Sequence, residues 1–342
     1  MFVNSWSIAL LICSAAALFI TGGSVQTAIK VLRFWNGDSD SAGQIRLESE
    51  TWLAALLVQY AMFLQLISLC LLVMALDSYA EVLVGAMCAT GALFASSYGP
   101  PILLLKIIGL FFFGGWILTH RLDLCSESSP LIRLKFSLLL LLLPLQIIDA
   151  FCLLAYLSEL EPDIITSCCG VIFGNGARDG RNFVGPLPIL PLMILFYTLG
   201  AVIFGHSLVV VKRDTCNRYG MANFISLTFS VLWLLFFLLA LMVVVAVISS
   251  YIYGMPSHRC PFDILKKEYN FVGYPIYLTL FIATFSGMSA GGVGVLGSLP
   301  GLRKHVDRYS KAATRTAIVF LPIFLLLVTW FPAAYILAGG ER

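Results

Sequence analysis

The chain has 342 residues, of which 60% are hydrophobic and 11% are charged, and its formal net charge at pH 7 is +3. Soluble domains are about half apolar and about a quarter charged, so this composition excludes an ordinary soluble fold and predicts that lipid surrounds much of the chain. The small net charge, without a block of like charges, gives no indication of nucleic-acid binding.

Eight apolar segments are long enough to cross a membrane, which takes about 20 residues of helix. They are residues 2–22, 52–76, 100–120, 134–157, 188–211, 224–254, 272–299 and 317–338. The runs are continuous, whereas the strands of a barrel would be short and alternating. The sequence therefore predicts an all-α integral membrane bundle of about eight transmembrane helices, with residues 1–342 forming a single polytopic membrane domain and no soluble domain.

A ninth apolar stretch, residues 80–97, is placed by the distribution of charge. If it does not cross, Lys and Arg concentrate in the connections after the first, third, fifth and seventh spans, with Lys135 counted among them. Cytoplasmic loops carry the basic excess, so these connections face inside and both termini face outside. Residues 80–97 are then expected to form a re-entrant or surface helix on the outer side.

Four of the nine cysteines fall on that outer side: Cys88, Cys168, Cys169 and Cys260. In a bacterium this is the oxidising face, where thiols pair, bind metal or do redox work. His258 lies two residues before Cys260 and adds an imidazole to the group. Three other cysteines lie in spans and are expected to pack as small apolar side chains: Cys13, Cys70 and Cys152.

Three kinds of chemistry fit the outer cysteines. In the first, Cys168 and Cys169 form structural disulfides with Cys88 and Cys260, in either order, because neighbouring cysteines seldom bond each other. In the second, the four thiolates and His258 bind copper or zinc. In the third, the thiols exchange disulfides with a periplasmic partner or a quinone.

The cysteines lie in distinctive local sequences: Gly85-Ala-Met-Cys-Ala-Thr-Gly91, Ile165-Thr-Ser-Cys-Cys-Gly170 and His258-Arg-Cys-Pro-Phe-Asp263. Together with the stretches Gly99-Pro-Pro…Lys106 and Glu268-Tyr-Asn-Phe-Val-Gly-Tyr, these boxes resemble a family of bacterial multi-span inner-membrane proteins without an assigned activity. The resemblance implies a bacterial inner-membrane location and a loose association with periplasmic thiol or copper handling. The last box of the family resembles C-P-F-C, and this chain departs from it at Asp263, which weakens a dithiol mechanism there.

Two ionisable residues fall inside predicted spans, where charge is costly and is a functional candidate by default. Lys106 and Asp149 lie at similar depths in the adjacent, antiparallel third and fourth spans, so we expect them to pair. The pair either locks the two helices together or takes part in a proton or ion step. His120 and His206 lie near inner ends of spans, whereas haem ligands are usually deeper, so haem b is not expected.

The segment Gly292-Val-Gly-Val-Leu-Gly297 matches the dinucleotide pattern G-x-G-x-x-G. It lies inside an apolar span without a preceding strand, so its context gives no indication of nucleotide binding. The preceding run from Gly287 indicates close helix packing or a local break in the helix. No internal repeat is apparent in the sequence.

The leading hypothesis is a membrane component that uses the outer cysteine/histidine cluster for thiol redox or soft-metal handling, with membrane or periplasmic protein partners as well as the lipid bilayer. A second hypothesis is a non-catalytic structural subunit of a larger membrane complex, in which disulfides staple the loops. A third is a transporter of a small solute or ion that uses Lys106 and Asp149. No nucleic acid or nucleotide partner is expected.

Overall fold

The computed structural model describes residues 4–37, 39, 41–126, 129–161, 163, 188–212, 221–255, 258–299 and 301–339. The chain divides into two compact units, unit 1 (Met1–Thr166) and unit 2 (Ser167–Arg342). That the chain forms one domain remains a prediction.

Among the residues that the structure describes, eight helices are long and apolar enough to cross a membrane. They span Ser5–Phe34, Ala42–Val82, Gly99–Asp123, Ile132–Glu159, Ile189–Lys212, Ile225–Tyr253, Gly273–Gly297 and Arg303–Leu337. Strands are absent from the residues that the structure describes. The predicted all-α membrane bundle is confirmed, and the protein is a multi-pass membrane protein.

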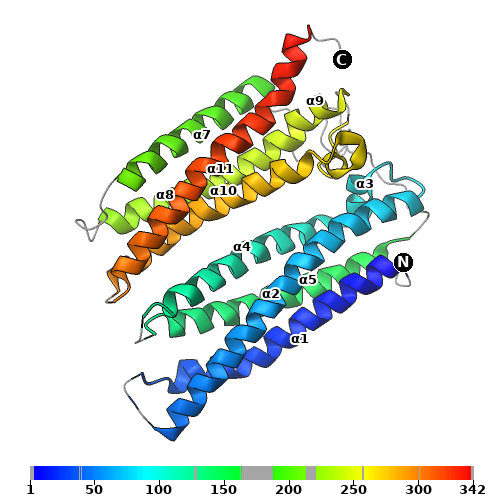
Figure 1. Cartoon of the computed structure of the whole chain (residues 1–342). Helices are drawn as coiled ribbons and strands as arrows, with labels where there is room; N and C mark the ends of the chain where they lie inside the picture. Colours follow the sequence, from blue (N-terminus) through cyan, green and yellow to red (C-terminus); the bar gives the residue numbers. More distant parts are fainter. Residues whose placement is uncertain are drawn as a thin grey trace. The chain divides into compact units, whose positions relative to one another are not determined.

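Unit 1 is a ring of four long helices, α1 (Ser5–Phe34), α2 (Ala42–Val82), α4 (Gly99–Asp123) and α5 (Ile132–Glu159). Around the ring α1 packs on α2, α2 on α4, α4 on α5, and α5 on α1 (Figure 1). The buried face of α1 repeats every seven residues and carries small side chains: Ser7, Ser14, Thr21 and Ala28. Small residues of this kind let neighbouring helices approach closely in lipid.

Unit 2 is also a ring of four long elements. They are α7 (Ile189–Lys212), α8 (Met221–Val243), α10 (Gly273–Gly294) and α11 (Arg303–Leu337). Helix α8 continues directly into η2 (Val244–Ile248) and α9 (Ser249–Tyr253). Its core contains the buried aromatic rings of Phe196 and Phe236, which stack on each other, and of Phe324, which meets both edge-on. A Cβ atom at Gly287 of α10 would lie 2.1 Å from Cε2 of Trp233, so only glycine fits against α8 there. Close packing therefore explains the run from Gly287, which continues as helix without a break to Gly294.

The two rings repeat the same order of elements. In unit 2, α7 packs on α8, α8 on α10, α10 on α11, and α11 on α7, as the corresponding helices do in unit 1. In both units a cysteine-bearing connection joins the second long helix to the third, and the third begins with Gly-x-Pro-Ile-x-Leu, at Gly99 and at Gly273. A structural repeat is thus present where no sequence repeat was apparent, because the shared letters are few.

Several helices extend beyond the apolar segments. Helix α2 begins at Ala42 and α11 at Arg303, each well before its predicted span, because polar residues outside the hydrocarbon also adopt helix. In the stretch 80–97, α2 continues to Val82 and a six-residue helix, α3 (Ala89–Phe94), follows. The short α3 is the element that the sequence predicts as a surface or re-entrant helix.

Candidate functional site

The connection between α9 (Ser249–Tyr253) and α10 carries the box that ends at Asp263. After the Cys260-Pro261 step the chain forms two short turns of 3₁₀-helix, η3 (Asp263–Leu265) and η4 (Lys267–Tyr269). The Cys260 side chain is fully buried, and Asp263 is 6% exposed. A thiol and a carboxylate are thus held inside a segment that the sequence presents as a loop.

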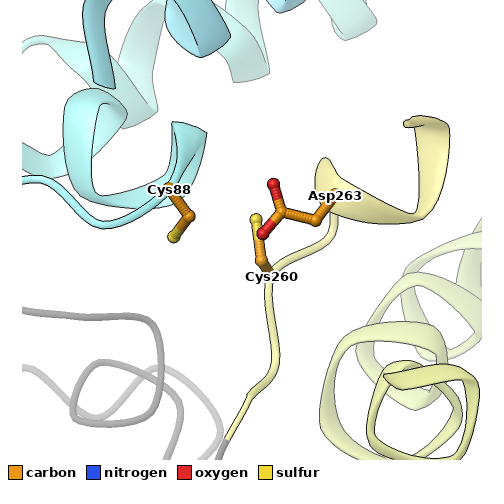
Figure 2. Close-up of side chains that lie close together, drawn as sticks. All are labelled: Cys88, Cys260 and Asp263. Atoms are coloured by element: carbon orange, nitrogen blue, oxygen red, sulfur yellow. The ribbon is translucent and has the colours of Figure 1, made fainter. Parts of the chain in front are cut away.

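Asp263 contacts an imidazole and an ammonium group of the same connection. Its Oδ2 lies 2.9 Å from Nε2 of His258, and its Oδ1 lies 3.0 Å from Nζ of Lys266. The Sγ of Cys260 is within 4.8 Å of a carboxylate oxygen of Asp263, and Figure 2 shows the two side chains next to each other. Sulfur, nitrogen and oxygen donors therefore meet around one carboxylate.

Two tyrosine hydroxyls fix the backbone that carries the thiol. Tyr253 donates to the carbonyl of Cys260, and Tyr277 of α10 donates to the carbonyl of Pro261 at 2.7 Å. The Tyr253 ring also packs edge-on against His258, at a centroid distance of 4.3 Å. Because both carbonyls are bonded, the thiol is presented on a fixed backbone.

The third tyrosine at this site, Tyr269, packs against Tyr253 at a centroid distance of 4.6 Å. Burial raises the pKa of Tyr269, and the negative charges of Asp263 and Glu268 raise it further. At neutral pH this phenol is therefore neutral.

Two features of the backbone position the residues around Asp263: a π-helix before Tyr253 and a close approach at Gly273. A π-helix, η2 (Val244–Ile248), lies between α8 and α9, one turn before Tyr253. Such an insertion changes the direction in which later side chains point, and π-turns are frequent at functional sites. At the far side of the connection, a Cβ at Gly273 would lie 2.9 Å from the carbonyl oxygen of Ile264, so glycine is required where α10 meets η3.

The corresponding connection of unit 1 places Cys88 at the N-cap of α3, where it is 2% exposed (Figure 2). The hydroxyl of Tyr156 on α5 donates to the carbonyl of Ala92 at 2.9 Å and ties α3 to the bundle. At Gly99 a Cβ would collide with the carbonyl oxygen of Leu93, so α4 also begins against its connection. Each unit therefore buries one cysteine between its second and third long helices.

The other predicted thiols are distributed differently. Cys168 and Cys169 lie outside the described residues, so their predicted pairing with Cys88 and Cys260 remains a prediction. Cys88 belongs to unit 1, whereas His258 and Cys260 belong to unit 2. The three cysteines predicted to pack in spans range from buried to exposed: Cys152, Cys13 and Cys70.

The charged pair predicted in the membrane lies in the interior of unit 1. Nζ of Lys106 is 2.9 Å from Oδ2 of Asp149, and their side chains are 0% and 4% exposed. Lys106 also donates to the hydroxyl of Ser68 at 2.9 Å, and the amide of Gln65 donates to the same Asp149 oxygen at 3.0 Å. Gln59, also on α2, donates to the carbonyl of Ala55 in its own helix at 3.2 Å.

A second buried ion pair joins the end of α4 to the start of α5, away from the Lys106–Asp149 pair. Nζ of Lys135 is 2.9 Å from Oδ2 of Asp123, and 3.5 Å from Nδ1 of His120. The other Asp123 oxygen accepts from the backbone N–H of Leu131, and Trp116 donates to the carbonyl of Lys135. The prediction that Lys135 is a loop charge was wrong: the residue lies in the first turn of α5, its side chain is 5% exposed, and it closes the α4–α5 hairpin.

This second pair had a sequence signal. Asp123 ends one helix and Lys135 lies in the first turn of the next, so opposite charges face each other across a short turn. The two histidines that were weighed as haem ligands belong to different units, His120 to unit 1 and His206 to unit 2.

No protein-family model, curated protein or solved structure matches this chain. The fold alone therefore defines the class: a multi-pass α-helical membrane protein with a buried ion-pair interior in one unit and a buried thiol–carboxylate site in the other.

Proposed function

We propose that this protein handles a borderline divalent metal ion, zinc, at the connection between α9 and α10. The single observation that carries the proposal is the meeting of Cys260, Asp263 and His258 within one short, largely buried segment. Zinc takes thiolate sulfur, imidazole nitrogen and carboxylate oxygen together, with tetrahedral geometry. Three protein donors and one open position are typical of sites that exchange or activate a ligand.

The donor set favours zinc over copper(I). Copper(I) prefers soft sulfur ligands, whereas a carboxylate suits harder or borderline ions. Asp263 fits either as a direct ligand or as the partner that orients His258, since metal-bound histidines commonly donate their second nitrogen to a carboxylate. Cys88, Cys168 and Cys169 remain predicted ligands beyond this set.

The same connection supports dithiol exchange less well. Exchange needs a second thiol to attack the first disulfide. Asp263 stands where a C-P-F-C box would place that thiol, and its carboxylate cannot form a disulfide. Metal binding uses the groups that this segment contains.

The proposed setting is a bacterial inner membrane with both termini and the metal site on the outer side. The excess of Lys and Arg in the opposite connections supports this orientation. The connection would then receive metal from, or pass it to, a periplasmic or membrane protein partner.

The test is zinc binding by the purified full-length protein in detergent, measured by calorimetric titration and by metal content after desalting. We expect one zinc per chain, lost in Cys260→Ser and in Asp263→Asn. If Asp263 instead only orients His258, Asp263→Asn weakens binding by about 10–100-fold, and His258→Ala, which removes a direct ligand, abolishes it. Cys70→Ser is the matched control, because Cys70 is an exposed thiol on α2.

Two outcomes contradict the proposal. One is zinc binding by Cys260→Ser that equals binding by the unsubstituted protein. The other is copper(I) bound in preference to zinc when the two metals compete, which would assign the site to a softer ion.

A further inference from the structure

Polar atoms in the interior of unit 1 lack hydrogen-bond partners among the residues that the structure describes. They are both amide atoms of Gln146, Oδ1 of Asp149 and the hydroxyl of Ser14. These three side chains belong to residues that are 4%, 3% and 6% exposed. Buried polar groups are almost always bonded, to protein or to water, so a group of this size indicates a ligand.

The atoms belong to two helices of unit 1 that pack against each other, α5 and α1. Gln146 and Asp149 are three residues apart, so they share one face of α5, and both are buried in the bundle. Ser14 lies on the buried face of α1, the helix that packs against α5. The other oxygen of Asp149 is already occupied by Lys106 and Gln65.

We propose that unit 1 binds water at this place, in a site formed by Gln146, Asp149 and Ser14. A water molecule can accept from the amide nitrogen and donate to the amide and carboxylate oxygens, and buried waters typically make about three such bonds. The inference concerns unit 1 and does not depend on metal binding by unit 2.

A metal cation fits the site less well than water. The ammonium group of Lys106, 2.9 Å from the far oxygen of Asp149, already neutralises the carboxylate and would repel a second positive charge. The unbonded amide nitrogen of Gln146 is a donor and needs an acceptor, which a cation cannot supply.

Along the buried face of α5, the site is followed by apolar side chains in one direction and by hydroxyl groups in the other. In one direction the same face of the helix continues with Leu142 and Leu139, which belong to the apolar cluster around Phe113. In the other direction it reaches Tyr156, whose hydroxyl bonds to α3. Near this end the hydroxyls of Ser7 and Tyr79 also bond to each other at 2.7 Å. The site therefore lies between an apolar layer and a layer of buried hydroxyl groups.

The test is hydroxyl-radical footprinting by X-ray radiolysis of the full-length protein in detergent, read out by mass spectrometry. Radicals formed from a bound water oxidise its neighbours even where bulk solvent does not reach. The reporter is Cys152, a buried thiol one turn beyond Asp149 on the same face of α5. We expect its oxidation in the unsubstituted protein, resistant to scavengers in bulk solution, and a decrease of at least about threefold in Gln146→Leu.

The control is Leu142→Ile, a substitution of equal volume one turn away on the apolar side that adds no oxidisable sulfur. It should leave the oxidation of Cys152 unchanged. Thermal unfolding of each variant shows whether it is folded before irradiation.

Three results would overturn the proposal. The first is an equal rate of Cys152 oxidation in Gln146→Leu and the unsubstituted protein. The second is complete suppression of that oxidation by bulk scavengers. The third is a change in oxidation when choline replaces sodium in the buffer, because that would assign the site to a cation.

Discussion

The two units use the same ring of four long helices and fill it in opposite ways. The interior of unit 1 holds two buried ion pairs, Lys106–Asp149 and Lys135–Asp123. In the described parts of the four long helices of unit 2 no Lys, Arg, Asp or Glu is buried, and aromatic rings around Phe196 form the core. The same order of packed helices can therefore enclose either buried ion pairs or packed aromatic rings. The order of the helices does not determine which of the two fills the interior.

The largest expected effect comes from breaking one ion pair of unit 1. Lys106→Met leaves the carboxylate of Asp149 buried without its partner, which we expect to cost about 3–5 kcal/mol. The double variant Lys106→Met/Asp149→Leu removes both charges and should regain most of that loss. Unfolding of the purified protein in mixed detergent measures both free energies.

If the single and double variants are destabilised equally, the loss of stability comes from changed side-chain packing and not from an unpaired buried charge. If the third hypothesis of a transporter holds, solute flux in proteoliposomes should be lost in both variants, irrespective of stability.

A smaller effect is expected from Gln65→Leu on α2. Its amide donates to the charged oxygen of Asp149, and hydrogen bonds to charged groups contribute about 1.5–3 kcal/mol. Gln59→Leu is the control on the same helix, because Gln59 donates to the carbonyl of Ala55 in its own helix and not to a charged group among the described residues. The comparison fails if the two variants unfold at the same detergent fraction.

In unit 2 the sensitive position is a contact between helices. Gly287→Ala would place a methyl group against the ring of Trp233, and overpacking of this kind costs about 1–3 kcal/mol. Gly292→Ala, five residues along the same helix, meets nothing within 4 Å and should be tolerated. Unfolding that follows the opposite order would contradict the close approach of α8 and α10.

The smallest effect that we predict is that of Tyr253→Phe, which removes the hydrogen bond to the carbonyl of Cys260. A single neutral hydrogen bond contributes about 0.5–1.5 kcal/mol. Zinc affinity should fall with stability, because the backbone of the thiol is less fixed. Tyr251→Phe, whose ring packs against Tyr335, serves as the control. Unchanged zinc affinity would show that the tyrosine does not position Cys260.

The number of spans could be predicted from the sequence because burial in hydrocarbon demands long apolar runs. The approach of Lys106 to Asp149 also follows from depth in adjacent, antiparallel helices. By contrast, the role of Lys135 was missed, since a charge near a helix end resembles a loop charge in sequence. Its burial depends on Asp123 and on the turn that returns α5 against α4.

The site around Asp263 was predictable only in part. Its neighbours His258 and Cys260 are evident in the sequence, but Asp263 was considered there only as a missing cysteine. Its role as the common partner of an imidazole and an ammonium group depends on the turn η3 and on Tyr253 and Tyr277, which come from two different helices. No local pattern carries that information.

The π-helix η2 (Val244–Ile248) also bears on how this chain tolerates insertion and deletion. Successive residues of an α-helix are turned by about 100° from one another, so an inserted residue redirects every side chain that follows it until the helix ends. Here the helix ends only five residues later, at Tyr253, so the redirected part is a single turn that contacts the Cys260 connection. Deletion of one residue from η2 would leave the membrane span almost as long and would rotate Tyr253 away from Cys260. A change of one residue in η2 can therefore alter the direction of the Tyr253 side chain while the length of the membrane span stays nearly the same.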